Sequence, residues 1–92
     1  MHMQKAMKRT VNVAGQGISV PGLLIDLLPR ARAAYLARCS RRGIETLRPD
    51  EFCSDVRLVD GDYYVILASS EGRLAEYLVH GDPHGRFKLI GR

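Results

Sequence analysis

Residues 56–79 read VRLVDGDYYVILASSEGRLAEYLV, and this stretch decides the fold. Its side-chain pattern has the period of two that is typical of β-strands, and turn-forming residues interrupt it. Asp60-Gly61 is a strong hairpin signal, because a tight two-residue turn needs positive φ angles that Asp and Gly tolerate. Ser70-Glu71-Gly72 marks a second turn. The stretch therefore predicts three consecutive antiparallel strands.

A fourth strand completes the predicted sheet. It follows a polar loop at residues 80–86 that contains Gly, Pro and Asp. We predict strands at Val56–Val59, Tyr63–Ala68, Leu74–Val79 and Phe87–Ile90. The pattern upstream is helical, so the fold class is α+β, with an N-terminal helical segment packed on a four-stranded antiparallel β-meander.

The helical segment begins near residue 20. Ser19 is expected to cap it. Pro29 removes a backbone donor and presses on the preceding turn, so we predict a short helix over 21–28, a kink or break, and a longer helix over 29–42. Gly43 is expected to end the second helix in a left-handed conformation.

Helical periodicity assigns two faces to the longer helix. The apolar face, expected to pack on the sheet, comprises Leu28, Tyr35, Leu36 and Cys39. The basic face, expected to point to water, comprises Arg30, Arg38 and Arg41. Pro49-Asp50-Glu51-Phe52 predicts one further helical turn with Phe52 as its inward anchor. Residues 1–20 are expected to be partly extended or flexible, with short extended pieces around Gly15-Gln16-Gly17.

Length and composition predict one domain over residues 1–92. The 92 residues suffice for one hydrophobic core and not for two, and 46% hydrophobic with 26% charged residues is typical of a globular chain. Two cysteines are too few for the disulfide framework of a small secreted protein. No segment has the apolar length of a membrane span, and the N-terminus lacks a signal-peptide pattern. We therefore expect a cytoplasmic protein without a membrane partner. Its preference for Arg over Lys suggests a bacterial or phage origin.

The hairpin at Asp60-Gly61 also fixes which residues share a face of the sheet. One face receives Val56, Leu58, Tyr63, Val65 and Leu67. The opposite face receives Tyr64 and Ile66. In the next strand, one face carries Leu74, Glu76 and Leu78, and the other carries Ala75, Tyr77 and Val79. Both faces are substantially apolar, whereas a sheet with one face in water alternates cleanly.

One helix covers one face, so the second face needs a different cover. The candidates are the first 20 residues, the short helix at 21–28, a second copy of the chain and a foreign protein. We predict a non-enzymatic binding protein that works through protein–protein contact as a homodimer, because two-fold self-association is the commonest way for a protein to cover such a patch. The predicted protein-interface residues are Tyr64, Ile66, Leu74 and Leu78.

The sequence contains no pattern that predicts catalysis, a metal or a cofactor. His80 and His84 are four apart, but the Gly and Pro residues around them exclude the helix that such a ligand pair needs. Cys39 and Cys53 lack the close pairing of zinc ligands. No P-loop or dinucleotide-binding pattern occurs. We therefore expect a protein without catalytic, cofactor-binding or metal-binding residues.

Nucleic-acid binding is the alternative. Residues 1–48 hold nine Lys or Arg and two acids, whereas residues 49–92 hold five and eight. The predicted contact residues are Arg30, Arg38, Arg41 and Arg42. A third hypothesis comes from residues 61–67, GDYYVIL, which resemble the G-D-Y-R-V-I-Y strand of RelE/ParE-type bacterial toxins. The resemblance implies an RNA-cleaving toxin, but Tyr64 stands where that family has the arginine that would contact phosphate.

Overall fold

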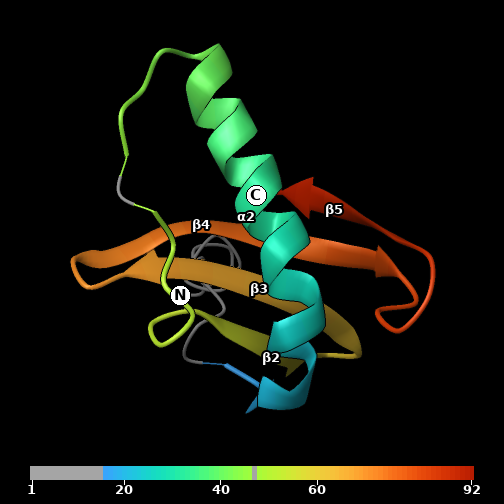
Figure 1. Cartoon of the computed structure of the whole chain (residues 1–92). Coiled ribbons are helices and arrows are strands. Elements are labelled where there is room, and N and C mark those ends of the chain that lie inside the picture. Colours follow the sequence, from blue (N-terminus) through green and yellow to red (C-terminus); the bar gives the residue numbers. More distant parts are fainter. Residues whose placement is uncertain (1–15, 47) are drawn as a thin grey trace, which may run out of the picture.

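A computed structural model describes residues 16–46 and 48–92 of the chain, which form one α-helix packed on a five-stranded antiparallel sheet (Figure 1). The elements follow the order β1 (Ile18–Ser19), η1 (a 3-10 turn, Pro21–Leu23), α2 (Leu24–Arg41), β2 (Asp55–Val59), β3 (Asp62–Ser69), β4 (Gly72–Gly81) and β5 (Phe87–Gly91). The strands lie in sequence order across the sheet. The α+β class and the antiparallel meander are confirmed, but the sheet has five strands where four were predicted, because the short extended piece expected after Gly15-Gln16-Gly17 pairs with β2 as β1.

The hairpin between β2 and β3 has the predicted two-residue turn. Asp60 and Gly61 both have positive φ angles, 51° and 86°, and Val59 pairs with Asp62. This turn places Val56 opposite Val65 on one face and Arg57 opposite Tyr64 on the other. The assignment of β2 and β3 residues to the two faces is therefore confirmed.

Strand β1 extends the sheet beyond β2. Ile18 pairs with Leu58, and the Arg57 guanidinium donates hydrogen bonds to the carbonyl oxygens of Gln16 (2.8 Å) and Gly17 (3.0 Å). Gly17 has a φ of +67°, and a Cβ there would collide with the Leu58 carbonyl oxygen. Residues 16–19 therefore lie close against β2. The extended pieces predicted nearer the N-terminus fall outside the described residues.

Ser19 does not cap the helix, contrary to the prediction. It lies in β1, and its hydroxyl donates a hydrogen bond to Asp55 Oδ1 at 2.7 Å. The chain instead enters α2 through the 3-10 turn that starts at Pro21, where a missing N–H costs nothing.

The predicted break at Pro29 is also wrong, because α2 runs without interruption from Leu24 to Arg41. Proline removes the hydrogen bond to the Ile25 carbonyl, and Pro29 itself lies on the exposed side of the helix. Leu27 and Leu28 before it and Ala31 after it are buried in the same core. Packing on both sides of the proline therefore holds one helix together against the local cost.

The end of α2 agrees with the prediction. Gly43 has a φ of +67°, its N–H bonds to the Ser40 carbonyl (3.1 Å), and the Ile44 N–H bonds to the Cys39 carbonyl (2.9 Å). These two bonds form a Schellman motif, which commonly brings the residue after the glycine into contact with the last helical turn. The motif therefore directs Ile44 back toward Cys39.

The core lies between α2 and the sheet. Its fully buried side chains are Leu27, Val56, Val65 and Leu67. The helical stripe that packs runs through Leu24, Leu27, Leu28, Ala31 and Tyr35. Arg38 follows this stripe three residues after Tyr35, so it lies on the sheet side of α2, and its predicted place on the water-facing side is wrong. Leu36, predicted to pack, is only half-buried.

Phe52 was also misplaced by the prediction. It is 90% exposed, and the residue that is buried in this turn is Pro49. The Asp50 carboxylate accepts the Phe52 N–H at 2.9 Å, while the Asp50 carbonyl accepts the N–H of Ser54 at 2.9 Å. These local hydrogen bonds, which Asp commonly makes, set the turn, and Phe52 does not anchor it.

Candidate binding surfaces

The face of the sheet that points away from α2, here the outer face, carries most of the predicted interface. The register places Tyr64 of β3 opposite Leu78 of β4, and Leu78 opposite Ile90 of β5. Tyr64 and Leu78 are half-buried, whereas Ile90 keeps 45% of its surface exposed. An apolar row therefore crosses three adjacent strands and is most exposed at its β5 end.

Ile66 lies beside this row and is buried. Only 4% of its surface is exposed, and it forms a small cluster with Val59 and Tyr64. The structure therefore brings three of the four predicted interface residues to one face, but Ile66 supports the surface from below and offers little contact area itself.

A charged cluster, which the sequence reasoning missed, shares the outer face with the apolar row. Glu76 is only 7% exposed, and its carboxylate contacts Arg73 at 3.2 Å and Arg92 at 3.1 Å. The Arg92 guanidinium also lies 5.0 Å from the centre of the Tyr64 ring. A buried carboxylate needs such partners, since an unpaired one loses its hydration without compensation. The period-two pattern predicted that Glu76 lies on this face, but it did not predict that the Glu76 side chain is buried.

Leu74 is the predicted interface residue that lies elsewhere. The pairing of β3 with β4 shifts register, so that Leu67 pairs with Ala75 and Ala68 with Arg73. Leu74 is the extra residue of this bulge, and its side chain lines a groove on the α2 side of the sheet. Its predicted place beside Glu76 and Leu78 is therefore wrong.

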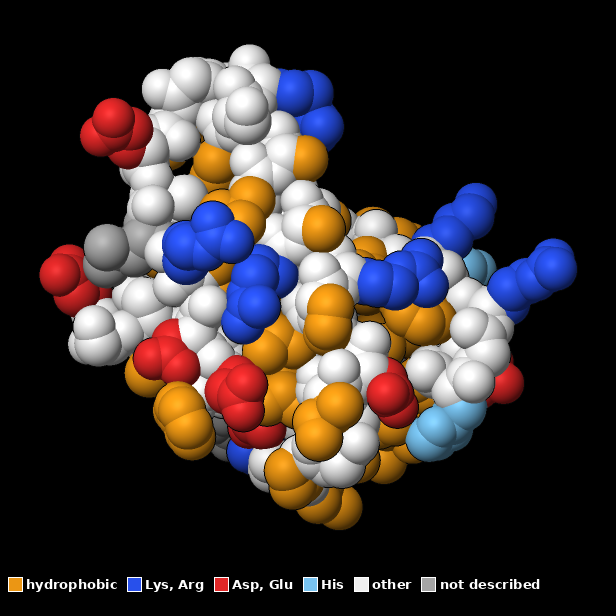
Figure 2. Space-filling model, in the orientation of Figure 1, with side chains coloured by type: hydrophobic (Ala, Val, Ile, Leu, Met, Phe, Trp, Pro, Cys, Tyr) orange, Lys and Arg blue, Asp and Glu red, His pale blue; other side chains and the backbone are white. Residues whose placement is uncertain are grey.

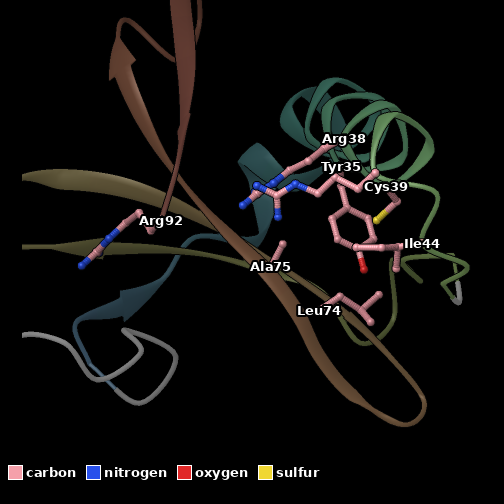
Figure 3. Close-up of a pocket in the computed structure, with 8 residues that line it drawn as sticks. Tyr35, Arg38, Cys39, Ile44, Leu74, Ala75 and Arg92 are labelled. Atoms are coloured by element: carbon pink, nitrogen blue, oxygen red, sulfur yellow. The ribbon is translucent and has the colours of Figure 1, made fainter.

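This groove is an open hollow of about 200 Å³ between the C-terminal half of α2 and strand β4. Figure 3 shows Tyr35, Cys39, Ile44 and Leu74 gathered around its apolar end. Its lining residues are Tyr35, Arg38, Cys39, Arg42, Ile44, Leu74, Ala75 and Arg92. In the same view Arg92 lies at the far end and points away from the apolar residues. The groove is thus apolar at one end and basic along its side.

Tyr35 is fixed in the wall of the groove. Its hydroxyl and the Thr46 hydroxyl lie 2.6 Å apart and share a hydrogen bond. Burial raises the pKa of the Tyr35 phenol above its ordinary value near 10, the hydrogen bond to Thr46 lowers it, and the neighbouring Cys39 raises it further. The phenol is therefore a neutral, held side chain at physiological pH.

The four arginines of the nucleic-acid hypothesis do not share one face. Arg30 lies over the Phe87 ring, with its guanidinium carbon 4.0 Å from the ring centre, while Arg38 lines the groove. Arg41 and Arg42 are exposed at the end of α2. Figure 2 shows basic side chains spread over the α2 side of the molecule with apolar surface between them. Nucleic-acid binding by these arginines stays a prediction.

The residues weighed for chemistry lie apart. His80 is exposed near the end of β4 and His84 is exposed in the β4–β5 connection, where the Asp82 carboxylate accepts the His84 backbone N–H at 2.9 Å. Cys39 is buried and Cys53 exposed, each as a free thiol. Within residues 16–46 and 48–92, no three His, Cys, Asp or Glu side chains are grouped to hold a metal ion. In that same part of the chain, no helix has both the length and the apolar character needed to cross a bilayer.

The chain has no match among known protein-family models, curated proteins or solved structures. The resemblance of residues 61–67 to a toxin strand therefore gains no support from these comparisons. In the structure Tyr64, the residue that departs from the toxin pattern, lies on the outer face beneath the Arg92 guanidinium.

Proposed function

We propose that this chain is a non-enzymatic binding protein that acts through protein–protein contact and forms a homodimer through the outer face of its sheet. The observation that carries the proposal is the apolar row Tyr64–Leu78–Ile90, which crosses three strands and leaves Ile90 45% exposed. Burying such a row in a partner is favourable, because each apolar side chain removed from water contributes to the free energy of association.

The charges of the outer face favour a second copy over a foreign partner. Beside the apolar row this face holds both signs, with Glu76 contacted by Arg73 and Arg92. A two-fold dimer places the same patch on both sides, so the patch must be complementary to itself. Mixed charges around an apolar centre meet that condition. The α2 side is less suitable, since the arginines of the groove would face their own copies.

Of the other candidate covers, the 21–28 segment is unsuited to the outer face, and so are residues 18–19 of the first 20. The 21–28 segment contributes Leu23, Leu27 and Leu28 to the core on the opposite face. Residues 18–19 pair with β2 at the edge of the sheet and so extend the face. Residues 1–15, which were also considered, lie outside the described part of the chain.

The test is the mass of the protein in solution. Sedimentation equilibrium over a wide concentration range should show a reversible monomer–dimer equilibrium for the wild type. Leu78→Asp should shift it to monomer, because a carboxylate would have to lose its hydration in the interface. Leu36→Asp is the matched control, since Leu36 is also a half-buried leucine but lies on α2.

A wild-type protein that stays monomeric at all concentrations would overturn the proposal. So would a Leu78→Asp variant that dimerises as tightly as the wild type. Circular dichroism of both variants confirms that each remains folded.

A further inference from the structure

We propose that a pocket beside the N-terminal half of α2 binds a free aliphatic amino acid. The ligand's carboxylate contacts an arginine, its ammonium group contacts a glutamate, and its side chain lies against the helix. The pocket, here called the helix pocket, is lined by Leu24, Ile25, Leu28, Pro29, Arg32 and Glu51. It is on the α2 side of the sheet, so it is separate from the outer face and does not depend on the proposed homodimer.

One row of α2 residues forms most of the helix pocket. Ile25, Leu28 and Arg32 recur at spacings of three and four, which places them one above the other along the helix. Leu28 is 5% exposed and belongs to the core, so it is a fixed apolar part of the wall. Ile25 is 79% exposed, which leaves apolar surface for a ligand to cover. The helix therefore supplies an apolar wall that ends in a cation.

The other wall belongs to the turn at residues 50–54, which carries Glu51. This turn is tied to β3, because the Asp50 N–H donates to the Ala68 carbonyl at 2.8 Å and the Ser54 hydroxyl accepts the Ala68 N–H at 3.0 Å. The Asp50 carbonyl also accepts the Ser54 N–H at 2.9 Å. Helix and turn are thus both held by contacts elsewhere, and a ligand needs to order little of the protein.

Arg32 and Glu51 are the charged residues of the helix pocket. Among the described residues neither side chain has an ion-pair partner, although both line the same hollow. The Arg32 Nε atom is buried and has no hydrogen-bond partner in that part of the chain. A buried donor without an acceptor is costly, and a carboxylate is the acceptor that a guanidinium binds best. Glu51 repels a ligand that carries a carboxylate alone, so the ligand needs a positive group as well.

Pro29 adds an acceptor for that positive group. In an α-helix the N–H of residue 29 would occupy the Ile25 carbonyl, and proline has no N–H to donate. Ile25 and Pro29 both line the helix pocket. An ammonium group has several N–H donors, so it can bond to Glu51 and to the Ile25 carbonyl together.

The size of the helix pocket restricts the ligand to a small molecule. Its volume is about 150 Å³, whereas typical small-molecule sites have roughly 300–1,000 Å³. A cavity of roughly 150 Å³ in another protein takes up benzene, so a hollow of this size accommodates the side chain of leucine and leaves the charged groups at the open side. A peptide terminus carries only one of the two charges, which favours the free amino acid.

The experiment titrates the isotope-labelled full chain with L-leucine and follows its backbone amides by NMR. Amides of residues 24–32 and 50–53 should shift in a saturable way, with a dissociation constant on the order of 1 mM for so small a ligand. Isocaproate, which is leucine without the amino group, and leucinamide, which lacks the carboxylate, should each bind about tenfold more weakly.

Two variants test the charged contacts separately. Arg32→Gln should weaken leucine binding on the order of tenfold and leave leucinamide binding unchanged, because the lost contact is to the carboxylate. Glu51→Gln should weaken leucine binding about threefold and strengthen isocaproate binding, because the repulsion is removed. Arg38→Gln is the matched control, since Arg38 is also a half-buried arginine of α2 but lines the other groove, and it should leave the affinity within about twofold.

A wild-type protein that shows no saturable shift with leucine would overturn the proposal. So would isocaproate that binds as tightly as leucine, or equal losses in Arg32→Gln and Arg38→Gln. The comparison of leucine with its two analogues uses the wild type, so it decides the matter if Arg32→Gln does not fold. Leu78→Asp should keep the wild-type affinity for leucine, because Leu78 lies on the outer face. Loss of leucine binding in that variant would refute a separate site, while self-association alone judges the homodimer.

Discussion

Replacing Ile90 by Ser tests the outer face at its most exposed point. Ile90 keeps 45% of its surface in water, and full burial of such a side chain contributes about 2–3 kcal/mol. Covering the remaining surface in a dimer is therefore worth about 1 kcal/mol per copy. A two-fold interface contains the residue twice, which gives about 2 kcal/mol for the dimer, or a dissociation constant raised about 30-fold in Ile90→Ser.

Ile25→Ser is the control for this experiment. Ile25 is 79% exposed, more than Ile90, but it lies on α2, on the other side of the sheet. Analytical ultracentrifugation of both variants should show the 30-fold weakening for Ile90→Ser and a change within about twofold for Ile25→Ser. Equal effects, or an Ile90→Ser effect below about threefold, would refute the assignment of the dimer to the outer face.

Two further predictions concern stability. Tyr35→Phe should lower the free energy of unfolding by about 1 kcal/mol at neutral pH, because the hydrogen bond between the Tyr35 and Thr46 hydroxyls is lost. Because burial raises the pKa of Tyr35, the folded state keeps the phenolic proton at alkaline pH values where the unfolded state releases it. The contribution of Tyr35 to stability is therefore complete below about pH 10 and is lost as the pH rises above it. Denaturant titrations should show a steeper alkaline loss of stability for the wild type than for Tyr35→Phe. Gly61→Ala should cost about 1 kcal/mol, because φ is +86° there, and lower the thermal midpoint by about 4–8 °C.

For each stability prediction, a specific result would contradict the reasoning. If the stability difference between wild type and Tyr35→Phe stayed constant from pH 7 to strongly alkaline solution, the phenol would not be held in its protonated form by folding. For the turn, Gly22→Ala is the matched control, since a Cβ at either Gly22 or Gly61 meets nothing within 4 Å and only Gly61 has a positive φ. Equal effects of the two glycine substitutions would contradict the backbone argument.

The sheet was predictable wherever short-range chemistry decides the structure. Asp60-Gly61 defines its own turn, and that turn fixes the faces of β2 and β3 without any knowledge of distant contacts. The left-handed Gly43 is a similar case, because the conformation depends on the residue itself. Both were read correctly from a few neighbouring residues.

Elements that depend on distant partners were missed or misread. β1 has two residues, and what makes it a strand is the pairing of Ile18 with Leu58, 40 positions away. Pro29 predicted a break because its cost is local, whereas the packing that outweighs the cost comes from the sheet. Leu74 was misplaced by a register shift, and the regular alternation of a strand contains no sign of one.

Of the two candidate surfaces, the outer face was predictable from the sequence and the groove was not. Tyr64 and Leu78 were found because a hairpin register brings them together. The groove was not, since it joins the end of α2 to the edge of β4 through Arg38, whose side of the helix was misjudged. A helical wheel centred on Leu27 and Ala31 would have placed Arg38 correctly.

The bulge at Leu74 gives strand β4 two separate duties. C-terminal to it, Glu76 and Leu78 belong to the outer face, while Leu74 itself serves the groove on the opposite side. Because of this extra residue, nearby positions of one strand face opposite sides of the sheet, so the side chains of one surface can be substituted without changing the other surface. Deletion of Leu74 would restore the regular alternation of β4, and the groove would lose the leucine of its wall while Glu76 and Leu78 kept their places on the outer face.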